Sequence, residues 1–109
     1  MNKGNLLDKL PTVGQGEVFE ALLERQGVLI ERIVSRGQCS APDFWYESRR
    51  TEWVLLLRGS ARLMWGDGSE QALESGDYVT IPAHCRHRVA WTAPDCDTVW
   101  LAVHLPEES

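Results

Sequence analysis

The stretch GDYVTIPAHCRHRV, Gly76 to Val89, places a glycine–aspartate turn before a β-type run and a proline before a second turn. His84 and His87 lie three residues apart in it, with Cys85 between them. Imidazole nitrogen and thiolate sulfur both bind metal ions such as zinc. The stretch is therefore a metal site, half of one, or a turn that happens to contain histidines.

Short β-type runs continue on both sides of this stretch, from about residue 28 onward. They lie in VLIERIVS, DFWYES, EWVLLLRG, ARLMWG, EQALES, DYVTIPA, HRVAWT and TVWLAVHL. Turn signals such as Gly66-Asp67-Gly68 and Ala93-Pro94-Asp95 separate them. Many short strands between Gly and Asp turns predict an all-β sandwich or barrel, and no strand–helix alternation indicates a parallel sheet.

The segment before these runs has a different pattern. Residues 1–15 are polar with scattered Leu and Pro, which predicts an arm lying across the domain. GEVFEALLERQG, residues 16–27, predicts a short helix that ends at a glycine. Its apolar residues at helical spacing are Val18, Phe19, Leu22 and Leu23. We therefore expect an N-terminal arm and helix over 1–27, packed on a β-domain over 28–109.

Length, charge and cysteine content limit the possible partners. A chain of 109 residues suits one domain. Its net charge of -5, without a concentrated basic face, argues against nucleic acid and anionic membrane surfaces. Three cysteines with no CxxC pair favour reduced thiols, and hence a cytoplasmic location, over a disulfide framework. No apolar run approaches the roughly 20 residues that span a bilayer.

Together with EWVLLLRGSARL, Glu52 to Leu63, the opening stretch resembles the cupin superfamily. The first cupin motif ends in Glu and, seven residues later, Gly, and Glu52 and Gly59 match that ending. The residues that match the second motif are Gly76, Pro82 and His87, and His84 stands where this motif has an inner Gly. The resemblance covers about residues 28–104. It implies a small antiparallel jelly-roll barrel, often dimeric, with a pocket inside.

The resemblance carries only part of the cupin metal site. Cupin metals are typically held by two first-motif histidines, the motif glutamate and the second-motif histidine. In one alignment frame the two histidine positions are Trp45 and Glu47, and in the other they are Tyr46 and Ser48. Glu52 and His87 therefore remain as the matching ligands.

Other side chains could complete such a site. Glu47 is one candidate if its strand turns that face inward, and His104 is another because it shares a face with the inward residues of the last strand. Carboxylate oxygens with imidazole suit Zn, Mn or Fe as divalent ions. Each candidate also has a plainer interpretation, as a solvated or packed residue.

Strand alternation predicts the rest of the pocket. Because side chains alternate along a strand, residues two apart share a face. If Glu52 and His87 point inward, their strand neighbours do so too. The predicted pocket residues are Val54, Leu56, Val89 and Trp91, with Trp45 added in the first alignment frame and His84 at the rim.

Two functions are consistent with these residues. The first is a cupin that binds a divalent metal and a small organic molecule, with no reaction assigned. The alternative is a metal-free cupin that binds or senses a small molecule. Trp53, Leu55 and Leu57 form an apolar outer face that needs cover, which predicts a homodimer or N-terminal packing there.

Overall fold

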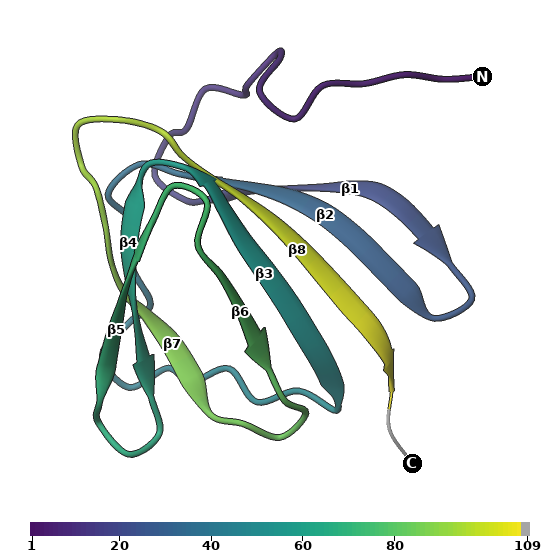
Figure 1. Cartoon of the computed structure of the whole chain (residues 1–109). Coiled ribbons are helices and arrows are strands. Elements are labelled where there is room, and N and C mark those ends of the chain that lie inside the picture. Colours follow the sequence, from purple (N-terminus) through teal and green to yellow (C-terminus); the bar gives the residue numbers. More distant parts are fainter. Residues whose placement is uncertain (108–109) are drawn as a thin grey trace.

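The computed structural model describes residues 1–107 and consists of two facing antiparallel β-sheets, as Figure 1 shows. The strands are β1 (Val18–Arg25), β2 (Val28–Ser35), β3 (Arg50–Arg58), β4 (Ser60–Trp65), β5 (Glu70–Glu74), β6 (Tyr78–Ile81), β7 (His87–Thr92) and β8 (Thr98–Glu107). One sheet has the order β1-β2-β8-β3-β6 and the other has the order β5-β4-β7. The sheets are not closed into a barrel. No described residue belongs to a helix that could span a membrane.

The core lies between the two sheets. In β3 the alternation holds as expected: Val54 and Leu56 are buried, while Trp53 and Leu55 are only partly covered. The facing sheet contributes Leu63 and other apolar side chains to the same cluster. Burying a leucine or valine side chain completely stabilises the fold by roughly 1.5–3 kcal/mol. Alternating burial therefore specifies which face of each strand looks inward.

The predicted N-terminal helix is wrong, because residues Val18–Arg25 form strand β1. Gln26 and Gly27 both have positive φ, 52° and 81°, which makes the two-residue hairpin turn that matches the twist of paired strands. A register shift between Ala21 and Leu23 inserts an extra residue in β1. Such a bulge interrupts the period-two alternation of a strand, and here it leaves apolar spacings that imitate a helix.

The arm is attached to the sheet through Arg32, on the face turned away from the core. The Arg32 guanidinium donates hydrogen bonds to the carbonyl oxygens of Leu6, Asp8 and Lys9, at 3.1, 2.8 and 3.3 Å. It also forms a two-point contact with the Glu20 carboxylate on β1, with both N–O distances 3.0 Å. The buried guanidinium is therefore paired with a carboxylate and hydrogen-bonded, which offsets the cost of burying its charge.

The outer face of β3 is covered incompletely. Trp53, Leu55 and Leu57 are all partly buried, and the ring of Trp53 lies 5.6 Å from that of Tyr78. Tyr78 itself is 66% exposed. The predicted homodimer would cover this face, and it stays a prediction.

Candidate functional site

A cavity of about 290 Å³ lies between the two sheets. Its apolar wall is formed by Phe19, Ile33, Val54, Leu63, Ile81, Val89, Trp100 and Ala102. Its polar wall is formed by Glu17, Glu31, Tyr46, Glu47, Ser48, Arg50, Glu52, His87 and His104. The cavity therefore combines an apolar wall with a polar wall that is rich in ionisable groups.

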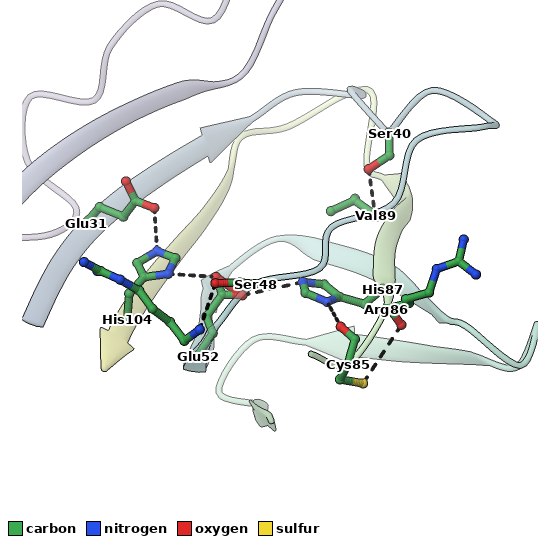
Figure 2. Close-up of polar contacts among 10 residues, drawn as sticks. Glu31, Ser40, Ser48, Glu52, Cys85, Arg86, His87, Val89 and His104 are labelled. Carbon is green, nitrogen blue, oxygen red and sulfur yellow. Dashed lines mark hydrogen bonds and ion pairs between the residues drawn. The ribbon is translucent and has the colours of Figure 1, made fainter. Parts of the chain in front are cut away.

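Four of these ionisable groups form a continuous row, shown in Figure 2, which we name the carboxylate–imidazole chain: Glu31, His104, Glu52 and His87. The first three come from the neighbouring strands β2, β8 and β3, where Glu52 and His104 are directly opposite each other. His87 opens β7 in the facing sheet. The row thus joins the two sheets across the cavity.

His104 lies between two carboxylates. Its Nε2 is 2.8 Å from Oε1 of Glu31, and its Nδ1 is 3.3 Å from Oε2 of Glu52. An ionised carboxylate only accepts hydrogen bonds, and neutral imidazole has one donor. The Nε2 contact with Glu31 has hydrogen-bond geometry, and the Nδ1 contact with Glu52 is within ion-pair distance. His104 therefore lies in contact with both carboxylates at once.

His87 is oriented by the backbone. Its Nδ1 is 2.9 Å from the carbonyl oxygen of Cys85, which can only accept, so Nδ1 donates and Nε2 faces Glu52 at 3.7 Å. Tyr46 stacks on the ring with centres 5.5 Å apart and planes inclined by 22°. Burial lowers the pKa of the imidazole, but the contacts with Glu52 and the Cys85 carbonyl, together with the Glu52 charge, raise the pKa by more. The net pKa lies above its ordinary value.

Two further groups in the cavity have raised pKa values, for which burial is the largest cause. The pKa of the Tyr46 phenol is raised, first by burial and then by the charges of Glu17, Glu52 and Glu31. Burial also raises the pKa of Glu17, which accepts a hydrogen bond from the Ser35 hydroxyl. Burial and like charge both disfavour additional negative charge here.

The predicted metal centre is only partly brought together. Glu52, His87 and His104 meet, but the two imidazoles contact different oxygens of one carboxylate, and the second nitrogen of His104 faces Glu31. Glu47 lies at the rim, 54% exposed, with Oε2 3.9 Å from Arg86 Nε. Across residues 1–107, no three His, Cys, Asp or Glu side chains are gathered so that they could hold a metal ion. The residues as arranged do not fit a bound divalent ion, and the metal centre stays a prediction.

The structure places some of the predicted pocket residues at the cavity and others away from it. Val54 and Val89 line the cavity, whereas Leu56 is fully buried in the core beside it. Trp45 does not line the cavity: it packs outside, with the guanidinium carbons of Arg86 and Arg88 at 4.8 and 5.9 Å from its ring centre. Tyr46 and Ser48 of the second frame line the cavity, and so does Glu47 of the first.

Trp91 and His84 also lie away from the cavity. Arg62 pairs with Trp91, but the next residue of β4, Leu63, pairs with Val89, so Ala90 is an extra residue. This bulge reverses the alternation and turns Trp91 outward under the Arg62 guanidinium, 5.0 Å from its ring centre. His84 is an exposed turn residue with φ 67°, the left-handed conformation for which the cupin motif uses glycine.

Sequence reasoning missed two partly buried carboxylates, Glu31 and Glu17. Glu31 shares a strand face with Ile33, and a lone glutamate on the inward face of an apolar strand is a signal that could have identified it. No such signal marks Glu17, because it precedes a strand that was predicted to be a helix. Arg50 at the start of β3 was missed as well.

Comparison with known proteins agrees with this geometry. The family profile described as Cupin domain matches residues 32–104. A solved structure from Ralstonia eutropha JMP134, named as a candidate mannose-6-phosphate isomerase, is 48% identical, covers 97% of this chain and 99% of its own, and has a TM-score of 0.92.

More distant structures share the fold. A cupin superfamily protein of Desulfitobacterium hafniense DCB-2 is 19% identical, with 90% of this chain and 84% of that chain covered and a TM-score of 0.74. An RmlC-like cupin of Methanocaldococcus jannaschii with a double-stranded β-helix fold is 18% identical, with 91% and 88% covered and a TM-score of 0.70. A search of curated proteins gives no match. Because the cupin profile spans two thirds of its length, the chain belongs to the cupin superfamily.

Proposed function

We propose that this cupin binds a small organic molecule in the cavity between its sheets and holds the polar end of that molecule at the carboxylate–imidazole chain. The observation that carries the proposal is His104 held between Glu31 and Glu52 in a cavity that also has an apolar wall. Ligand sites typically combine apolar walls with a few convergent polar groups, and volumes begin at about 300 Å³. The cavity matches that description.

The proposed protein binds its ligand without a metal ion, as in the second of the two functions that the sequence suggests. A divalent ion would have to displace His104 from at least one carboxylate before three donors faced it together. His87 is better prepared, because its Nδ1 contact with the Cys85 carbonyl leaves Nε2 directed at Glu52. One imidazole and one carboxylate are fewer protein ligands than catalytic zinc sites use. Zinc, manganese and iron therefore enter the experiment as competitors.

The relative from Ralstonia eutropha raises sugar phosphate isomerisation as a second candidate. Phosphate is bound by arginine, lysine or backbone N–H groups. Arg50 is the only arginine or lysine among the residues that line the cavity, and four glutamates line it as well. We therefore expect no isomerisation of mannose 6-phosphate, and a coupled assay with that substrate checks this directly.

A thermal-shift screen tests the proposal. The purified chain is screened with small alcohols, sugars, amines, acids and aromatic compounds, with and without a chelator, and with zinc, manganese and iron salts alone. A ligand that binds only the folded state raises the melting temperature. We expect stabilisation by organic compounds that the chelator leaves unchanged. Stabilisation by an ion alone, or by no compound, would overturn the proposal.

A matched pair of variants locates the binding site. Val89→Phe adds a ring to the wall of the cavity. Val103→Phe adds the same ring on β8, on the strand face turned away from the cavity-lining residues Ala102 and His104. We expect the first variant to lose at least tenfold in affinity for any stabilising compound and the second to lose less than twofold. Equal losses in both variants would place the ligand elsewhere.

A further inference from the structure

The charges around the cavity are unbalanced. Its lining residues include the four glutamates Glu17, Glu31, Glu47 and Glu52, against one arginine, Arg50, and the two histidines of the carboxylate–imidazole chain. Even with both histidines protonated, the sum is negative if the carboxyls are ionised. With neutral histidines the excess is larger.

Partial burial of two of these glutamates strengthens the electric field that they produce in the cavity. The side chains of Glu31 and Glu52 are only 15% and 20% exposed. Charges in such a partly enclosed, apolar site are screened less than surface charges, and the walls focus their field. Burial first, and then the charges of Glu17, Glu52 and Glu31, raise the pKa of the Tyr46 phenol in the same cavity.

The apolar wall selects within the class of positive ligands. Phe19, Tyr46 and Trp100 contribute aromatic rings to the same cavity. Aromatic faces attract organic cations, and the aliphatic lining accepts an apolar body. A bare divalent ion uses neither of these features, and a carboxylate or phosphate would meet like charge.

From these observations we infer that the ligand is a small organic cation, an ammonium group carried on an apolar body, with its N–H groups directed at Glu31 and Glu52. This inference rests on the proposed function and names the ligand class of that site. An ammonium offers three donors, which carboxylate oxygens can accept. It also places positive charge where the cavity otherwise gathers negative charge.

The experiment compares matched compounds that share one body. Calorimetric titration at pH 7.5 uses 2-phenylethylamine, 2-phenylethanol and 3-phenylpropanoate, then the cyclohexyl compounds with the same three end groups. Within each set we expect the amine to bind at least tenfold more tightly than the alcohol, and the carboxylate to bind most weakly. Alcohol affinity equal to amine affinity, or tighter carboxylate or inorganic phosphate binding, would overturn the inference.

Charge variants assign the effect to the cavity. Glu31→Gln keeps the side-chain shape, and we expect it to reduce the preference for amine over alcohol at least threefold. Glu24→Gln makes the same charge change on the exposed part of β1 and should leave the preference within twofold. The comparison in the wild-type chain decides the matter if Glu31→Gln does not fold.

Failure of this inference differs from failure of the proposed function. If neutral compounds from the screen stabilise the chain and no amine binds, the ligand class is wrong and the pocket function stands. If zinc or manganese chloride displaces a bound amine at equimolar concentration, a metal ion is the preferred cation, and both proposals fail. If no organic compound of any charge binds, both fail as well.

Discussion

Glu52 is the residue on which the site depends, because both histidines contact its carboxylate. The pKa of His87 is higher in the folded chain than its ordinary value of 6.5. A raised pKa means that the folded state binds the proton more tightly, so the stabilisation is complete below pH 6.5 and is lost as pH rises through the folded value.

Replacing His87 tests this sign. We expect the difference in free energy of unfolding between wild type and His87→Asn to fall as pH rises from 6 to 8, by on the order of 1 kcal/mol, since solvent screens part of the interaction. Denaturant titrations at several pH values measure it. A difference that grows with pH would contradict the expectation.

His84 provides a second test at the residue scale. Its φ of 67° is strained for any residue with a Cβ atom, and its side chain is exposed. We expect His84→Gly to be more stable than His84→Ala by about 1 kcal/mol. Arg86, another exposed residue in the same turn, has no positive φ, so there alanine should be the more stable choice. Chemical denaturation of the four variants compares the two sites.

At the scale of elements, the tight turn between β3 and β4 allows the chain to pass from one sheet to the other. Gly59 has φ 98°, and a Cβ atom placed on it would lie 2.5 Å from Oγ1 and 2.8 Å from Cα of Thr98. Both the backbone conformation and the close approach to β8 therefore require glycine at this motif position. Gly68 has a similar φ of 88°, with open space around it.

The two glycines separate conformational strain from steric overlap. We expect Gly68→Ala to destabilise the fold by about 1–2 kcal/mol, from the left-handed conformation alone. Gly59→Ala should cost about 3 kcal/mol or more, because overlap with Thr98 adds to that strain. Thermal and urea unfolding give both values. Equal losses would show that β8 moves aside without cost.

At the scale of the whole molecule, Arg32 joins the N-terminal arm to the five-stranded sheet. It reaches three carbonyl oxygens of the arm and the Glu20 carboxylate at once, which uses the planar guanidinium with its several donors. Lysine has a single ammonium group and cannot make this set of contacts.

We expect Arg32→Lys to release the arm and to increase trypsin cleavage after Lys9 at least severalfold. Mass spectrometry of a digestion time course measures the rate. Arg36→Lys is the control, because Arg36 is exposed and contacts Asp95 and Asp97 rather than the arm. Unchanged cleavage in Arg32→Lys would mean that other contacts hold the arm.

The all-β class could be predicted from the sequence alone, because apolar alternation sets the inward face of a strand and turn residues set where strands end. The meeting of Glu52 with His87 was implied by the resemblance of their motifs to those of cupins. Gly59 follows Glu52 by seven residues and Pro82 precedes His87 by five, so the sequence spacing alone identifies both motifs.

The order of the strands in the two sheets could not be predicted from the sequence. Glu31 meets His104 across 73 residues because β8 inserts between β2 and β3. The bulge at Ala90 turns Trp91 outward. The segment Val18–Arg25 has apolar residues at helical spacing, but it forms strand β1 because it pairs with β2. Pairing and bulges depend on contacts between distant residues, and a local pattern does not contain them.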